Sequence, residues 1–242
     1  MKIDVVPLPG MLTDEHVRDR AVVVFDVLRA TTTIAAALAN GAKEIRVFDS
    51  LDAARSAASA FAGSKLLCGE SNCLPPAGFD LGNSPAAYAP ELVSGKTLFL
   101  STTNGTRALV AARKADLLLT GALVNARSVA AALKKQARDV TLLCAGTNGN
   151  DAPEDRLGCG AVLSHLVDAK GTILSANAGA ELASFQLLQP QLILELRRTE
   201  GGQNVIATGL ADDIRFAAQA DRFDIVPRCD GYAMAIRPMA IA

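Results

Sequence analysis

Acidic, hydroxyl and guanidinium side chains follow an apolar run near the start of this chain. Residues 22–25 are apolar and end at Asp26, and Arg29 and the hydroxyls of Thr31, Thr32 and Thr33 come next. A carboxylate can hold a metal ion or act as a nucleophile, whereas arginine and a helix N-terminus bind phosphate or sulfonate. A metal ligand and an anion-binding turn at one point of the chain are suited to the chemistry of phosphate esters.

The same pattern of an apolar run followed by polar residues recurs at two later points. Residues 97–100 and residues 140–144 are the two apolar runs. Serine and threonine are also ordinary helix N-caps, so any one of these turns is weak evidence. If the strands are parallel and adjacent, we expect the three turns to meet in one anion site. The residues that follow the two runs are Ser101, Thr102, Thr103, Asn104, Gly105, Thr106 and Arg107, and then Gly146, Thr147, Glu154 and Asp155.

Strand-like and helix-like segments alternate along most of the chain. This alternation predicts an α/β fold, in which three layers (α/β/α) surround a largely parallel or mixed sheet. Gly201-Gly202 is interpreted as a break. Strands are predicted at residues 2–6, 21–26, 44–48, 65–68, 97–100, 117–120, 140–144 and 191–196, with a late strand at 225–227. Helices are predicted at residues 32–40, 51–61, 106–112, 126–136, 157–169, 177–188 and 209–217.

The chain is interpreted as one α/β unit spanning residues 1–242. The weak similarity of the three turns leaves open a division into two similar halves near residue 125. Residues 70–90 are rich in Gly, Pro, Asn and Ser, and a loop of this length is usually functional or disordered. Its polar residues favour a functional loop.

The composition excludes several classes of protein. Half of the 242 residues are hydrophobic and the formal net charge is −1, so we expect neither a nucleic acid nor a membrane surface as partner. The absence of a signal-like apolar segment predicts a cytoplasmic protein, and a homo-oligomer is left open. The five cysteines include no Cys-x-x-Cys pair and there are only two histidines, which disfavours zinc sites and a Ser-His-Asp triad.

Three familiar phosphate- or nucleotide-binding motifs are incomplete here. A phosphatase of the haloacid dehalogenase type needs a second acid two residues after the nucleophile, and that position is Leu28. No Walker A sequence is present. Gly158 and Gly160 lack the third glycine and the preceding strand of a dinucleotide site, so a nicotinamide oxidoreductase is weakly supported.

Four segments together resemble the 2-phosphosulfolactate phosphatase family. They are residues 26–33, 78–85, 102–107, and 144–147 with the acid pair that follows, and the match extends over residues 3–230. The resemblance implies a Mg²⁺-dependent phosphatase that hydrolyses 2-phospho-3-sulfolactate, or a similar small anionic phosphomonoester, to sulfolactate and phosphate. In that family the reaction belongs to coenzyme M biosynthesis. One departure is Ser71-Asn72-Cys73, where the family has a basic, glycine-rich run.

The resemblance and the residue pattern together assign roles to three groups of residues. Magnesium takes one or two carboxylates and keeps water, so some of the candidate ligands must serve elsewhere, such as Asp80 in bracing its loop. Asp26 is either nucleophile or metal ligand; we favour the ligand, because no neighbouring acid is placed to protonate the leaving group. The catalytic candidates are Asp26, Arg29 and Arg107. The metal-ligand candidates are Asp26, Glu70, Asp80, Glu154 and Asp155. The substrate-binding candidates are Thr31, Thr32, Thr33, Asn83, Ser84, Thr102, Thr103, Asn104, Gly105, Thr106, Gly146 and Thr147.

The alternative function is a non-catalytic protein that binds small anions on the same fold. Such a protein would keep the arginines and the turns but would need no metal. A dependence of activity on magnesium distinguishes the enzyme from the binding protein.

Overall fold

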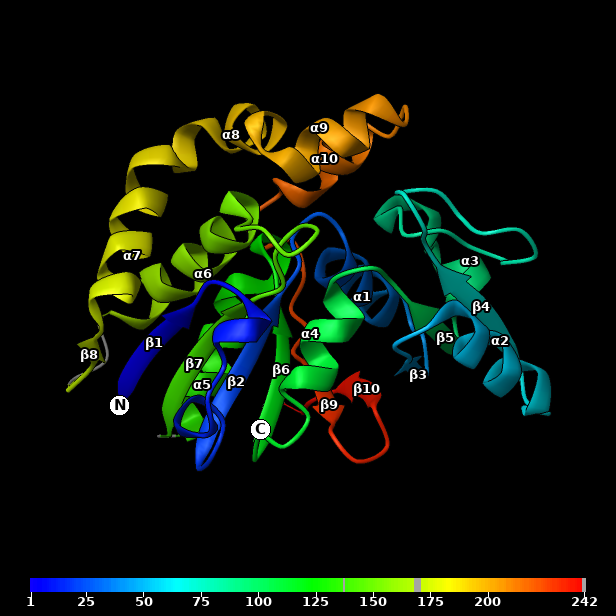
Figure 1. Cartoon of the computed structure of the whole chain (residues 1–242), viewed down its shortest axis with the longest axis horizontal. Helices are drawn as coiled ribbons and strands as arrows, with labels where there is room; N and C mark the ends of the chain where they lie inside the picture. Colours follow the sequence, from blue (N-terminus) through cyan, green and yellow to red (C-terminus); the bar gives the residue numbers. More distant parts are fainter. Residues whose placement is uncertain (137, 168–170, 241–242) are drawn as a thin grey trace.

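The structure is a computed structural model that describes residues 1–136, 138–167 and 171–240. Within these residues the strands form one mixed sheet in the order β4-β5-β3-β10-β9-β6-β2-β7-β1-β8, with helices packed against it (Figure 1). This confirms the predicted α/β class. The strands are β1 (Lys2–Val6), β2 (Arg20–Phe25), β3 (Glu44–Val47), β4 (Lys65–Gly69), β5 (Thr97–Ser101), β6 (Leu117–Gly121), β7 (Asp139–Cys144), β8 (Ile173–Leu174), β9 (Pro227–Asp230) and β10 (Ala235–Pro238).

Most helices follow a strand directly, as alternation of the two element types requires. The helices are α1 (Ala30–Ala39), α2 (Leu51–Ala60), α3 (Pro90–Val93), α4 (Gly105–Ala111), α5 (Ala126–Gln136), α6 (Pro153–Leu166), α7 (Ala176–Leu188), α8 (Leu192–Arg198), α9 (Glu200–Ala207) and α10 (Asp212–Ala217). Helix α6 begins four residues before its predicted start, and the predicted residues 168–169 lie outside the described residues.

Strand β2 is buried on both of its faces. Val23 and Phe25 belong to the hydrophobic cluster that includes residues of α5 and α6, whereas Val22 and Val24 belong to the cluster that includes residues of α1 and α4. A strand covered on both faces has a continuous apolar sequence, which is why residues 22–25 lack alternation. The end of β2 is therefore held rigidly in the middle of the sheet.

The sheet consists of two parallel blocks that run in opposite directions. Strands β6, β2, β7, β1 and β8 are parallel to one another, as are β3, β5 and β4. Between the blocks, β9 is antiparallel to β6, β10 to β9, and β3 to β10, so β3 is antiparallel to β6. Strands β2 and β7 are therefore adjacent and parallel, which is the condition under which the turns were expected to share one site. Strand β5 is adjacent to neither of them.

The strand predicted at residues 191–196 is wrong, because the segment is helical. Leu192 and Leu196 are buried, whereas Ile193 and Leu194 are substantially exposed. Burial four residues apart is the period of a helix, and a strand would have buried every second residue. The apolar run was too short to separate the two periods.

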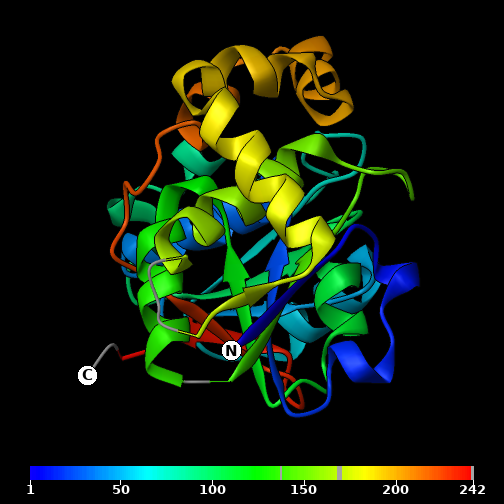
Figure 2. The same cartoon turned by 90° about the vertical axis from the view of Figure 1, so that its left-hand side faces the viewer.

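Helix α9 lies where the sequence indicated a break. Thr199 caps this helix by accepting a hydrogen bond from the N–H of Gly202 at 3.1 Å. Gly209, the predicted start of the next helix, has φ +79° and follows the end of α9 instead. Helices α8, α9 and α10 lie together above the ends of the central strands of the sheet (Figures 1 and 2).

No helix within the described residues is both long and apolar enough to cross a membrane.

Candidate active site

Asp26 directly follows β2 and lies at the beginning of α1. Its Oδ1 accepts a hydrogen bond from the N–H of Ala30 at 3.0 Å. Thr31 Oγ1 accepts a hydrogen bond from the N–H of Asp26 and donates one to its carbonyl oxygen, which fixes the backbone of the turn. The carboxylate is thus held at a helix N-terminus, where the free N–H groups favour negative charge.

Other carboxylates surround Asp26. The pKa of its carboxyl is raised from 3.8 to about 7. Burial is the largest cause and the negative charges of Glu70 and Glu154 add to it, whereas hydrogen bonds from the N–H groups of Ala30 and Gly105 lower it. Carboxylates that are held close together repel one another, so ionisation of all of them at once is unfavourable. A cation placed among these side chains would remove the repulsion.

Glu70 connects the loop after β4 to the turn after β5. Its Oε1 accepts a hydrogen bond from the N–H of Thr103 at 2.7 Å, and its Oε2 accepts one from the N–H of Cys73 at 3.0 Å. Asn104 Oδ1 in turn accepts a hydrogen bond from the N–H of Asn148, which follows β7. These contacts bring the turns of the two sheet blocks together, although β5 and β7 are not neighbours.

Asp155, in the first turn of α6, braces two strand ends. Its Oδ1 accepts a hydrogen bond from the N–H of Val27 at 2.7 Å, and its Oδ2 accepts one from the N–H of Gly146 at 3.1 Å. Burial raises the pKa of this carboxyl well above its usual range, and the neighbouring Asp26 charge adds to the rise. Both oxygens are used to position the backbone after β2 and β7.

Glu154 differs from its neighbour in having an oxygen left without a partner. Its Oε1 lies 3.4 Å from the hydroxyl of Thr147, whereas its buried Oε2 accepts no hydrogen bond within the described residues. Burial raises the pKa of this carboxyl. An unsatisfied buried carboxylate oxygen is uncommon and calls for a ligand or an ion.

Most of the predicted hydroxyls build the turns and do not line the cavity of the site. Thr31, Thr32 and Thr33 donate to the carbonyl oxygens of Asp26, Val27 and Asn83. Thr102 and Thr106 hydrogen-bond each other's backbone at the start of α4.

Two charged candidates lie apart from the cavity. Asp80 Oδ2 accepts a hydrogen bond from the N–H of Leu67 at 2.7 Å, so this carboxylate braces its own loop against β4. Arg107 is exposed on α4 and is not part of the cavity wall. Their predicted roles in binding metal and substrate stay predictions.

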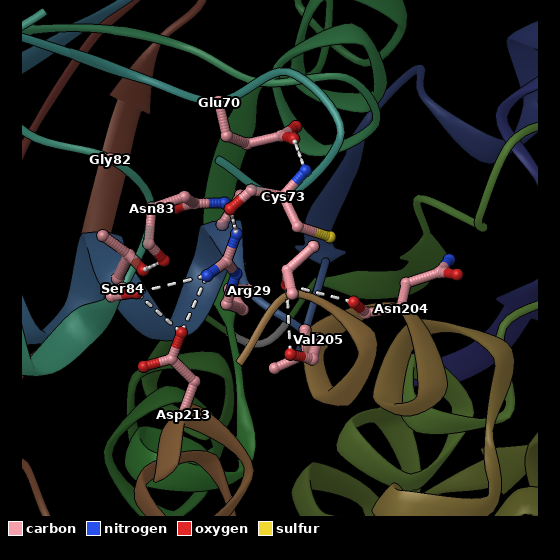
Figure 3. Close-up of polar contacts among 12 residues, drawn as sticks. Arg29, Glu70, Cys73, Gly82, Asn83, Ser84, Asn204, Val205 and Asp213 are labelled. Carbon is pink, nitrogen blue, oxygen red and sulfur yellow. Dashed lines mark hydrogen bonds and ion pairs between the residues drawn. The ribbon is translucent and has the colours of Figure 1, made fainter. Parts of the chain in front are cut away.

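Arg29 is buried in a network that joins three segments of the chain (Figure 3). Its Nη1 donates to Asp213 Oδ2 at 2.7 Å and to Ser84 Oγ at 3.2 Å, and its Nη2 donates to the carbonyl oxygen of Cys73 at 2.6 Å. The hydroxyl of Ser84 also donates to Asp213 Oδ2 at 2.8 Å. The guanidinium is therefore fixed from the loop after β4 and from α10.

A cavity of about 310 Å³ lies between these groups. Its volume suits a small molecule. Of the predicted residues, Asp26, Arg29, Glu70, Asn83, Thr103, Asn104 and Thr147 line it. The other lining residues were not among the predicted site residues, and they are Leu28, Asn72, Cys73, Asn148, Gly201, Asn204, Ala207 and Thr208.

Helix α9 supplies the part of the cavity wall that sequence reasoning missed. Gly201, Asn204 and Thr208 are spaced by three and four residues, as on one face of a helix. That spacing was available as a signal, but Gly201-Gly202 argued against a helix. Asp213 was also missed, and nothing in its local sequence sets it apart from Asp212.

The carboxylates at the cavity fit a magnesium ion. In the part of the chain that the structure describes, no three acidic, histidine or cysteine side chains converge closely enough to form a metal cluster, so the five predicted ligands do not form one cage. Magnesium needs no such cage, because it takes one or two carboxylates and keeps water or substrate oxygens. Asp26 and Glu70 line the cavity, and the unpaired oxygen of Glu154 lacks a compensating charge.

Comparison with known proteins gives one consistent result. The family model for 2-phosphosulpholactate phosphatase matches residues 7–231. A probable 2-phosphosulfolactate phosphatase of Carboxydothermus hydrogenoformans is 42% identical over 230 residues, 94% of this chain and 92% of that protein. One of Gloeobacter violaceus is 40% identical over 242 residues, covering 99% and 100% of the two chains. The chain belongs to the 2-phosphosulpholactate phosphatase family.

Proposed function

We propose that this protein is a magnesium-dependent phosphatase that hydrolyses 2-phospho-3-sulfolactate, or a similar small anionic phosphomonoester, to sulfolactate and phosphate. Family membership over nearly the whole chain and the names of the relatives support a phosphoric monoester hydrolase of this type. The observation that carries the proposal is the position of Asp26 and Glu70 on the wall of a small cavity, with Glu154 near enough to raise the pKa of Asp26.

Asp26 and Glu70 are the residues that would hold the magnesium ion. Bound there, the ion would neutralise charge on the phosphoryl oxygens and make water a stronger nucleophile. The N–H of Ala30 orients Asp26, and the N–H groups of Thr103 and Cys73 orient Glu70, so both carboxylates have defined positions at the cavity wall. We assign Asp26 the role of ligand.

Arg29 would bind an anionic group of the substrate. Its planar guanidinium suits phosphate, sulfonate and carboxylate, each of which offers two oxygens to a pair of parallel N–H donors. Among the described residues that line the cavity, Arg29 has the one cationic side chain, whereas Asp26 and Glu70 supply two carboxylates. With more negative than positive charge on its wall, the cavity would bind a multiply charged anion weakly unless a metal ion were present.

A phosphate-release screen tests the proposal. The chelated protein is incubated with small phosphomonoesters, including 2-phospho-3-sulfolactate, with and without added magnesium. We expect release of phosphate only with magnesium, and most rapidly from substrates that carry a second anionic group. Ligand affinity without turnover under any condition would support the non-catalytic anion-binding alternative. Asp52→Asn serves as a control, because Asp52 is an exposed carboxylate on α2.

A further inference from the structure

The ion pair between Arg29 and Asp213 is almost fully buried. The exposed fractions of the two side chains are 2% and 6%. A buried ion pair gains little over well-packed apolar residues, because its attraction must offset the desolvation of both charges. Stability therefore gives little reason for this ion pair, whereas the position of Arg29 on the cavity wall indicates a role in the site.

The hydrogen bonds leave part of the Arg29 guanidinium unused. Arginine has five N–H donors, two on each Nη and one on Nε. Within the described residues, both Nη1 donors and one Nη2 donor are used, by Asp213, Ser84 and Cys73. The Nε donor and one Nη2 donor remain, and neighbouring Nε and Nη2 nitrogens of a guanidinium can together bind one oxyanion.

Asp213 and Ser84 determine where this remaining pair of donors lies. Both hold the same nitrogen, Nη1, and the Ser84 hydroxyl is itself fixed by donating to Asp213. Because the guanidinium is planar and rigid, fixing Nη1 and Nη2 also fixes the edge formed by Nη2 and Nε. Asp213 lies on α10, which packs against α9, and α9 supplies Asn204 and Thr208 to the cavity (Figure 3). The positions of the Arg29 donors and of these two cavity residues therefore depend on the same group of helices.

We propose that Asp213 is a positioning residue, which acts with Ser84 to hold the unused edge of Arg29 toward the cavity, where that edge binds one oxyanion of the substrate. The inference rests on the proposed function, since the oxyanion belongs to the substrate of the same site. Asp213 itself does not touch the substrate. The oxyanion is either the phosphate or the second anionic group.

Calorimetric binding to the full chain tests this without requiring turnover. Inorganic phosphate and 3-sulfolactate are the probes, each in the presence of magnesium, and the variant is Asp213→Asn, which keeps the shape of the side chain and loses its charge. We expect the Kd for one of the two probes to rise by roughly tenfold or more, since a charge-assisted pair of hydrogen bonds loses its geometry. Which probe is affected identifies the oxyanion.

A matched control is present on the same helix. Asp212 is the preceding residue, its side chain is 91% exposed and it pairs with Arg215, so Asp212→Asn should bind both probes as the wild type does. A role confined to stability would lower the Tm of Asp213→Asn but leave both Kd values unchanged well below that temperature. Unchanged Kd values for both probes in a folded Asp213→Asn protein would overturn the proposal.

Ser84→Ala provides a second test in case Asp213→Asn does not fold. It removes one of the two groups on Nη1 and keeps the ion pair, so we expect the Kd for the same probe to rise by roughly threefold. Wild-type affinity of Ser84→Ala for both probes, with Asp213→Asn unfolded, would also count against the proposal. The two proposals fail separately: absence of phosphate release in the screen contradicts the enzyme, whereas the binding result stands independently of it.

Discussion

A Cβ atom on Gly201 would lie 1.9 Å from Oε1 of Glu154, so the backbone at the start of α9 is in direct contact with that carboxylate. The two residues come from different helices, Glu154 from α6 and Gly201 from α9 (Figure 1 shows both helices). The second glycine is equally constrained, because a Cβ on Gly202 would lie 1.9 Å from the carbonyl oxygen of Leu196. Gly201 thus allows the backbone of α9 to approach the site, and Gly202 allows it to approach α8.

Gly201→Ala should impair catalysis. The new methyl group must displace either α9 or the Glu154 carboxylate, and overpacking of this kind costs about 1–3 kcal/mol. We expect the Tm to fall and phosphate release to slow by roughly tenfold or more. Gly179→Ala is the matched control, because Gly179 is inside helix α7 with nothing within 4 Å of its Cβ position. It should leave the rate of phosphate release unchanged. A Gly201→Ala enzyme as active as the wild type would show that catalysis does not depend on this contact.

The stability of the metal-free protein should fall as the pH rises from about 5 to about 7. The folded state raises the pKa of Asp26 from 3.8 to about 7, so in this range it retains a proton that the unfolded chain has released. Stability decreases with pH wherever the folded state binds more protons. Thermal unfolding in EDTA at several pH values measures the slope.

Two comparisons make the pH experiment specific. Asp26→Asn removes the titrating group and should flatten the decline of Tm with pH. Added magnesium should also flatten it, because the ion stabilises the ionised carboxylates that the metal-free protein must otherwise bury together. A Tm that rises over this range in wild type but not in Asp26→Asn would contradict the predicted sign.

Arg29→Lys should lower kcat/KM, with a loss of transition-state stabilisation of about 2–3 kcal/mol, because lysine cannot replace the paired donors of a guanidinium. Arg107, the other arginine assigned from the sequence, provides the comparison. It is exposed and is not part of the cavity wall, so we expect Arg107→Lys to change kcat/KM by about threefold at most. Steady-state kinetics of both variants on one substrate measure the two effects. A larger loss for Arg107→Lys than for Arg29→Lys would support the substrate-binding role that the sequence predicts for Arg107.

The strand ends and their polar turns were predictable because they depend on local sequence. β1 agrees with its predicted bounds, and the predicted end of β2 lies one residue beyond the observed one. Hydrophobic runs bounded by polar residues carry enough information to place Asp26 at the carboxyl end of a buried strand. The loop after β4 was also identified by its composition as functional, and Asn72 and Cys73 line the cavity.

The contacts that complete the site were not predictable, because they join distant parts of the chain. Arg29 and Asp213 are 184 residues apart, and no local pattern distinguishes Asp213 from its neighbour. The turn after β5 meets the turns after β2 and β7 through a sheet in which the antiparallel pair β9–β10 joins the two blocks. The sequence analysis did not find β10. Glycines were interpreted as helix breakers, whereas at α9 they permit a close approach.

Asp26 should not become phosphorylated during turnover. As a ligand it forms no covalent bond to phosphorus, whereas a nucleophile would give an aspartyl phosphate. Rapid quenching of the reaction followed by mass spectrometry of the peptide that contains Asp26 distinguishes the two roles. We expect the unmodified mass at every time point, and a phosphoryl adduct on Asp26 would reverse the assignment.

The most direct test of a magnesium-dependent phosphatase is a magnesium titration of phosphate release from 2-phospho-3-sulfolactate, performed with chelated wild type and Asp26→Asn in parallel. We predict no release from the chelated wild type, full recovery on adding magnesium, and a much higher magnesium requirement for Asp26→Asn. Full activity of the rigorously chelated wild type, or an unchanged magnesium requirement in an active Asp26→Asn protein, would contradict this mechanism.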